Sequence, residues 1–175
     1  MYILFSSFTF NIYPNLHSNI WIYKEFDLNW NKCAIWALET TNPSYALWRK
    51  EEILECTRLC VEHNKVVKFI IEVAALSTKE IIVISQLIKE VILNNFDEQV
   101  TQKVFVKSST GFFKTDDNKP NGATFETIKL ISENAKPLQI KAAGGVRDYG
   151  TALKMISLGV DRIGTSSAKE ICLKK

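Results

Sequence analysis

Two lysines and three small, polar or glycine-rich segments have the residue types and spacing that could do chemistry in this sequence. The segments are residues 107–111 (KSSTG), 141–147 (KAAGGVR) and 164–167 (GTSS). Each segment follows a short run rich in β-branched or aromatic residues, which is typical of a strand. We therefore expect three strand tips that lie close together.

The two lysines suit amine chemistry. Lys107 and Lys141 each stand at the end of a predicted strand, where burial and a second positive charge both disfavour the ammonium form and lower the pKa. A free amine near neutral pH is a nucleophile for a carbonyl group and forms a Schiff base with it. The alternative is a strand-end lysine that only extends its charge into solvent. Two lysines in the same setting favour Schiff-base formation more strongly than a single lysine would.

The glycine-rich tips suit a phosphate group. Glycines let backbone N–H groups turn outward at a strand end, and the helix that follows presents its N-terminus there. Arg147 in the second tip could bind the phosphate with two N–H groups of its guanidinium, or it could pair with a surface carboxylate. The residues that we expect near a phosphate are Gly144, Gly145, Arg147, Gly164, Thr165, Ser166 and Ser167.

A proton-transfer group is needed as well, because a Schiff base becomes an enamine only by losing a proton. The candidate is Asp27, which lies in the predicted strand region 20–28, directly after Glu25 and Phe26. The alternative is a loop or capping aspartate, since an ionised carboxylate is costly to bury in a strand.

Alternating strands and helices must position these residues. Further strands are predicted at 3–10, 66–75, 103–106, 138–141 and 160–163, and helices at 45–63, 77–94, 124–133, 151–158 and 168–173. Ser77 with Glu80, and Thr124, are predicted helix starts, and Gly159 is a predicted helix end. This alternation predicts an α/β fold with a parallel sheet, such as a (β/α)8 barrel or a piece of one.

Composition limits the classes of protein. A chain of 175 residues with 46% apolar and 23% charged residues predicts one domain, 1–175, and a net charge of +3 gives no electrostatic case for nucleic acid. Residues 1–12 are apolar but predict a buried strand rather than a signal sequence or a membrane span. We therefore expect no membrane partner and a cytoplasmic location.

Cysteine and histidine usage gives no expectation of a metal or another cofactor. Cys33, Cys56, Cys60 and Cys172 form no CxxC pair, so buried or partly buried thiols in a reducing cytosol are expected. Only His17 and His63 are present, which leaves little for a histidine-based metal or triad site. All seven glycines lie at or after Gly111, so the first 110 residues have few turn signals.

Four blocks in order resemble the deoxyribose-phosphate aldolases. They are residues 105–112 (FVKSSTGF), 122–124 (GAT), 140–147 (IKAAGGVR) and 161–167 (DRIGTSS). Residues 67–72 (VKFIIE) are similar to the fifth strand of that family, and residues 25–27 (EFD) resemble its fourth-strand motif. The resemblance is fullest over 66–171, extends to residue 24 and is slight before that.

This resemblance implies a metal-free class I aldolase on a (β/α)8 barrel. Such an enzyme reversibly cleaves 2-deoxy-D-ribose 5-phosphate to D-glyceraldehyde 3-phosphate and acetaldehyde, in deoxyribonucleotide catabolism. Lys107 would form the Schiff base, Lys141 would lower its pKa, and Asp27 would hold a proton-relay water. The other residues expected at the substrate are Val146, which joins the phosphate-binding set, and Thr110 and Gly111, which lie in the first tip.

Some features depart from the family pattern. About the first two strands of the family have no counterpart here, so we expect an incomplete barrel. One alternative is therefore an inactive truncated remnant or gene-model fragment of such an aldolase, without catalysis. Another alternative is a different phosphate-binding barrel enzyme, such as an isomerase or another Schiff-base aldolase. The sequence leaves a homo-oligomer open.

Overall fold

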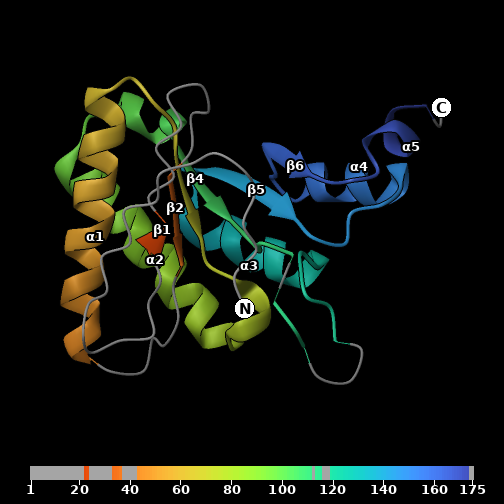
Figure 1. Cartoon of the computed structure of the whole chain (residues 1–175), viewed down its shortest axis with the longest axis horizontal. Coiled ribbons are helices and arrows are strands. Elements are labelled where there is room, and N and C mark those ends of the chain that lie inside the picture. Colours follow the sequence, from red (N-terminus) through yellow and green to blue (C-terminus); the bar gives the residue numbers. More distant parts are fainter. Residues whose placement is uncertain (1–21, 24–32, 37–42, 112, 116–118, 174–175) are drawn as a thin grey trace.

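The chain is described by a computed structural model, which covers residues 22–23, 33–36, 43–111, 113–115 and 119–173 (Figure 1). The strands are β1 (Ile22–Tyr23), β2 (Cys33–Trp36), β3 (Val67–Ile70), β4 (Val104–Lys107), β5 (Gln139–Ala143) and β6 (Arg162–Gly164). The α-helices are α1 (Pro43–Glu62), α2 (Thr78–Asn95), α3 (Phe125–Ala135), α4 (Tyr149–Ser157) and α5 (Ala168–Leu173). Two short 3₁₀ helices are η1 (Val73–Ala75) and η2 (Glu98–Lys103).

The six strands form one sheet in sequence order, β1-β2-β3-β4-β5-β6. β1 and β2 are antiparallel, and each later neighbouring pair is parallel. In Figure 1 the row of strands runs across the molecule from α1 to the β6 end, where α4 and α5 lie. The predicted parallel sheet with intervening helices is thus confirmed, and its carboxyl strand ends lie along one edge.

The hydrophobic core lies between one face of this sheet and the helices. Its largest fully buried members include Ile88 and Ile92 from α2 and Ile128 and Ile131 from α3. The strands contribute alternate residues to the same cluster, namely Val67, Phe69, Val104, Val106, Ile140 and Ala142. The residues that alternate with them, such as Lys107 after Val106, therefore point to the opposite face of the sheet.

The helix signals of the sequence act as predicted. The Ser77 side chain accepts from the Glu80 backbone N–H, and the Glu80 carboxylate accepts from the Ser77 N–H at 2.8 Å. Thr124 caps α3 in the same way, with Thr127 as its partner. Gly159 follows α4 with φ +96°, the left-handed conformation in which glycine carries no Cβ penalty.

Replacing Ser77 by alanine should lower the free energy of unfolding by about 1 kcal/mol, because one N–H at the start of α2 loses its acceptor. Ser157→Ala is the control, since Ser157 ends α4 on an exposed surface and its change should stay within about 0.5 kcal/mol. Urea denaturation of both variants measures the difference. Equal midpoints would contradict this role of the capping box.

One strand expectation differs from the structure. The predicted strand 66–75 ends at Ile70, because Glu72 adopts a left-handed backbone conformation with φ 52° and ψ 65°. The described residues of the predicted strand region 20–28 form β1, which pairs antiparallel with β2, and β2 is the parallel neighbour of β3. Residues 3–10 and Asp27 lie outside the described residues.

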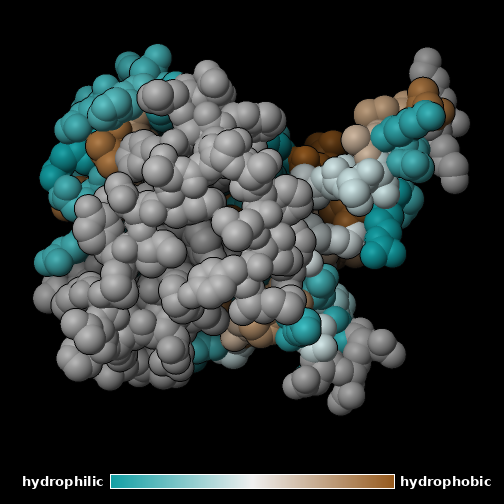
Figure 2. Space-filling model, viewed as in Figure 1, coloured by the Kyte–Doolittle hydropathy of each residue, from teal (hydrophilic) through white to brown (hydrophobic). Residues whose placement is uncertain are grey.

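The surface has an apolar end. Figure 2 shows apolar side chains on the segment formed by α4 and α5. The exposed large apolar residues there are Tyr149, Leu153, Ile156 and Leu173.

Cys56 and Cys60 are buried in the core as expected, while Cys172 is exposed. Of the helices that the structure describes, none is long and apolar enough to cross a membrane.

Candidate active site

Lys107 and Lys141 are partners in the register of two neighbouring parallel strands. Lys107 is the last residue of β4, and its Cα pairs with that of Lys141 on β5. Residues paired in this way point to the same face, and neighbouring strands lie about 4.8 Å apart. Both lysines are partly buried. The structure therefore brings the two predicted amines side by side on the face opposite the helices.

Other cationic and aromatic groups share this face. Arg162 on β6 is the register partner of Lys141, and its guanidinium carbon lies 4.4 Å from the centroid of the Phe105 ring. This distance is within the range of a cation–π contact. Lys68 on β3 pairs in register with Phe105, and only 4% of its surface is exposed. Several positive charges thus gather on the face that carries Lys107.

Ser108 fixes the direction in which the chain leaves Lys107. Its side chain is fully buried, and its hydroxyl donates to the Ala143 carbonyl at 3.0 Å and accepts from the Ala143 N–H at 3.0 Å. Its own N–H donates to the Lys141 carbonyl at 3.1 Å. These contacts continue the pairing of β4 with β5 past the two lysines, so the position of one lysine depends on the other.

A glycine on β6 makes room for the Lys141 side chain. A Cβ atom at Gly164 would lie 2.9 Å from Lys141 Cε and 3.5 Å from Lys141 Nζ. A carbon–carbon approach of 2.9 Å is well inside ordinary van der Waals contact. The absence of a side chain at Gly164 is therefore what lets Lys141 lie across this strand.

Gly164→Ala should leave the fold intact and displace the amine of Lys141, because the clash falls on the flexible end of a side chain. We expect kcat/KM to fall on the order of tenfold, since misplacing a catalytic group by about 1 Å can cost as much as a hundredfold. Gly150→Ala in α4 is the matched control. Steady-state kinetics with thermal melts of both variants measure this, and an unchanged kcat/KM in Gly164→Ala would contradict it.

The glycine tip after β5 has an unusual backbone. Gly144 and Gly145 have φ of +82° and +84°, a region that suits glycine alone among common residues. Gly122 lies directly against this tip, so that a Cβ there would be 2.6 Å from the backbone of Gly144. The Ala123 N–H donates to the carbonyls of Ala143 and Gly144, both at 3.1 Å. The tip is thus held in a conformation that two successive glycines permit.

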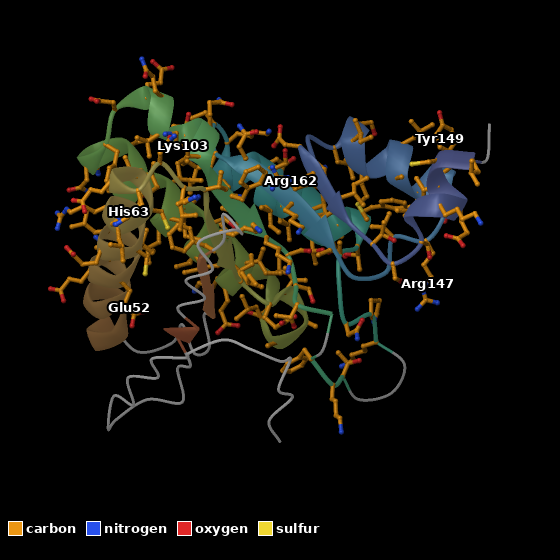
Figure 3. The ribbon with its side chains drawn as sticks, turned by 45° about the horizontal axis from the view of Figure 1, so that its top comes forward. Glu52, His63, Lys103, Arg147, Tyr149 and Arg162 are labelled. Carbon is orange, nitrogen blue, oxygen red and sulfur yellow. The ribbon has the colours of Figure 1, made fainter. Side chains whose placement is uncertain are left out.

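The other predicted phosphate-binding residues divide into structural and accessible groups. The Thr165 hydroxyl donates to the Val146 carbonyl at 2.6 Å and accepts from the Ser167 N–H at 2.9 Å, so it ties the β6 tip to the β5 tip. Val146 is buried, whereas Ser166 is exposed. Arg147 is exposed and points away from the strands, as Figure 3 shows.

The start of α4 is already capped by a side chain. The Asp148 carboxylate accepts from the Thr151 N–H at 2.9 Å and from the Thr151 hydroxyl at 2.6 Å. The sequence predicts that this N-terminus faces a phosphate. Because the Asp148 carboxylate already caps it, the backbone N–H groups of the glycine tip are the better candidates for binding a phosphate.

Thr110 and Gly111 lie in the tip that follows Lys107. Gly111 has φ +83°, and a Cβ at this position would meet no atom within 4 Å, so the tip borders open space. The Thr110 hydroxyl and N–H both donate to the Glu72 carboxylate.

Asp27 lies outside the described residues, so its expected role in proton transfer stays a prediction. Across the described ranges, no group of three potential ligands could hold a metal ion.

Sequence reasoning missed several residues that build this site. Glu72, Ser108, Asn121 and Gly122 hold the tips together, and Arg162 adds a charge beside Lys141. Ser108 and Gly122 lie in segments that the sequence analysis had singled out without giving these two residues a role, and the signal for Glu72 was an acidic residue in an otherwise apolar run, 69–73 (FIIEV). A buried carboxylate needs partners, and such a residue is therefore a candidate for a site.

Comparison with known proteins agrees with the resemblance. No model of a protein family matches the chain. The deoxyribose-phosphate aldolase of Dictyoglomus turgidum is 36% identical over 149 residues, which are 85% of this chain and 57% of that protein. That of Mycoplasma capricolum is 43% identical over 114 residues, 65% of this chain and 44% of that protein. The chain is a relative of the deoxyribose-phosphate aldolases. It spans about half the length of these curated relatives.

Solved structures place the fold in the same group. The aldolase QR15 superposes with a TM-score of 0.61 at 33% identity, over 81% of this chain and 57% of that structure. The deoxyribose phosphate aldolase of Aeropyrum pernix, described as tetrameric, superposes with a TM-score of 0.59 at 24% identity, which shows the fold alone. The five parallel strands β2 to β6 and their helices thus form part of a (β/α)8 barrel of the deoxyribose-phosphate aldolase type.

Proposed function

We propose that this chain acts as a class I aldolase on 2-deoxy-D-ribose 5-phosphate, in the cytoplasm, and releases D-glyceraldehyde 3-phosphate and acetaldehyde. The observation that carries this proposal is the side-by-side placement of Lys107 and Lys141 in register on β4 and β5. An amine beside a second cation at the carboxyl edge of a barrel sheet has the setting of a Schiff-base nucleophile.

The proposed reaction begins at the Lys107 amine. It attacks the C1 aldehyde of the open-chain sugar, and loss of water gives an iminium ion. A base removes the proton of the C3 hydroxyl, the C2–C3 bond breaks, and its electron pair moves into the iminium to give an enamine. Glyceraldehyde 3-phosphate leaves at this point. Protonation at C2 and hydrolysis then release acetaldehyde and the free lysine.

The other site residues have supporting roles in this proposal. Lys141 keeps the Lys107 amine unprotonated, and a water held by Asp27 carries the protons. The phosphate binds to the backbone N–H groups of the Gly144-Gly145 tip, next to the β6 tip that Thr165 ties to it. Because both tips adjoin Lys141, a phosphate there anchors the end of the sugar that is remote from the reacting C1.

A coupled assay tests this function. Acetaldehyde released from 2-deoxyribose 5-phosphate is reduced by alcohol dehydrogenase, and the loss of NADH is followed. We expect turnover, with kcat/KM at least about tenfold lower for 2-deoxyribose without its phosphate. Turnover of a different phosphosugar instead would favour another barrel enzyme. No turnover by a chain with a cooperative thermal transition would favour an inactive remnant.

Self-association is a separate part of the proposal. The chain exposes apolar side chains on α4 and α5, which several copies together would cover. Sedimentation velocity over a range of concentrations tests whether a homo-oligomer forms. A single monomeric species at all concentrations would contradict it.

A further inference from the structure

Glu72 is a buried carboxylate next to the proposed nucleophile. Its relative exposure is 0%, and no other carboxylate among the described residues is buried. Its backbone is left-handed, with φ 52° and ψ 65°, a region that residues other than glycine, asparagine and aspartate rarely adopt. Two unfavourable features in one residue indicate that the surrounding structure holds it in place for a reason.

The backbone around Glu72 has the residue count of a β-bulge. The Ile71 N–H donates to the Lys107 carbonyl at 3.0 Å, and the Val73 N–H donates to the Ser108 carbonyl at 2.8 Å. Between these two hydrogen bonds the chain advances by two residues after β3, from Ile71 to Val73, but by only one residue after β4, from Lys107 to Ser108. Glu72 is the extra residue, and bulges re-aim a side chain beside many active sites.

The Glu72 carboxylate binds the tip that follows Lys107. Its Oε1 accepts from the Ser109 hydroxyl at 2.6 Å. Its Oε2 accepts from the Thr110 N–H at 3.1 Å and from the Thr110 hydroxyl. The Ser109 hydroxyl also accepts from the Gly111 N–H at 2.8 Å and lies 2.7 Å from the Asn121 carbonyl. One carboxylate therefore organises both residues at the centre of this tip.

We propose that Glu72 is a positioning residue, which fixes the tip 108–111 against β3 and so holds the Lys107 amine at the angle needed for attack. On the β5 side the same tip is fixed by the bonds between Ser108 and Ala143. Glu72 supplies the matching attachment on the β3 side, so the lysine is held from both neighbouring strands. This inference rests on the proposed role of Lys107 as nucleophile.

The hydrogen bonds that Glu72 accepts predict which substitutions of this residue should disturb the tip. In Glu72→Gln, the amide oxygen can accept both bonds from Thr110, and the amide nitrogen can donate to the Ser109 hydroxyl, whose hydrogen then goes to the Asn121 carbonyl. In Glu72→Leu every acceptor is lost, and the Thr110 N–H is left without its partner. Gln should therefore preserve the position of the tip, and Leu should release it.

Two measurements on the full chain test the proposal. In Glu72→Leu, the Thr110 and Gly111 amides should exchange hydrogen at least about tenfold faster than in the wild type, while those of α2 and α3 exchange as before. Borohydride trapping at Lys107 should slow by about tenfold or more, with KM for the phosphosugar little changed. Glu72→Gln should behave as the wild type in both.

Ile92→Ala is the matched control for stability, because Ile92 is fully buried in the hydrophobic core on α2 and makes none of the hydrogen bonds that hold the tip. It should lower Tm without changing exchange at the tip. If Glu72→Leu does not fold, Ser109→Ala takes its place, since it deletes one Glu72 contact and the acceptor of the Gly111 N–H. Tip exchange and trapping in Glu72→Leu that match Ile92→Ala would overturn the proposal. If the wild type forms no adduct, the aldolase function fails, and exchange at the tip still decides the role of Glu72.

Discussion

Lys107→Met should abolish both turnover of 2-deoxyribose 5-phosphate and covalent trapping by borohydride. Methionine fills a similar volume at the end of β4 but has no amine, so neither the iminium nor the enamine can form. We expect kcat/KM to fall by at least about 10³-fold, as is usual when the nucleophile of covalent catalysis is lost. Steady-state assays and mass spectrometry of the reduced protein measure the two effects.

Lys103→Met is the control for this substitution. Lys103 lies just before the other end of β4, where its ammonium group donates to the Asn64 side chain at 2.8 Å. Removing it deletes the same number of charges from the same segment but should leave activity within about twofold, because surface contacts of this kind contribute little. Lys107→Met with kcat/KM near that of Lys103→Met would exclude Lys107 as the nucleophile.

Lys141→Met should raise the pH at which Lys107 becomes reactive. In the proposed mechanism a neighbouring ammonium group disfavours the charged form of Lys107 and so lowers its pKa. Without that neighbour the pKa rises, so less of Lys107 is a free amine at pH 7. Activity at pH 7 should fall about tenfold for each unit by which the pKa rises.

A pH series of trapping rates measures this shift. The midpoint in Lys141→Met should move upward. The full effect is limited because Arg162 and Lys68 stay on the same face. Lys141→Arg, which keeps the charge, should leave the midpoint closer to that of the wild type. A midpoint that stays in place or moves downward in Lys141→Met would contradict the electrostatic role of Lys141.

The sequence predicted those parts of the fold that depend on local signals. The Ser77–Glu80 capping box, the Thr124 cap and Gly159 after α4 act within one helical turn, and each lies where it was expected. The adjacency of Lys107 and Lys141 followed from strands that alternate with helices. Local chemistry and connection rules were sufficient for these features.

Features that depend on distant contacts were not predicted. The bond between Glu72 and Ser109 joins residues 37 positions apart in sequence, and the approach of Gly122 to Gly144 also links separate segments. Neither feature leaves a periodic pattern. The capping of α4 by Asp148 is a local feature, but the glycines before it favoured a phosphate at this helix start. Tertiary contacts of this kind decide the details of a site.

Peptide mapping of the borohydride-reduced wild-type chain tests the central claim most directly. The protein is incubated with 2-deoxyribose 5-phosphate, reduced, digested and analysed by mass spectrometry. The account predicts a covalent adduct on Lys107 and none on Lys141 or Lys68, because Lys107 alone stands at the tip that Glu72 and Ser108 hold. An adduct on a different lysine, or no adduct on a chain that unfolds cooperatively, would contradict it.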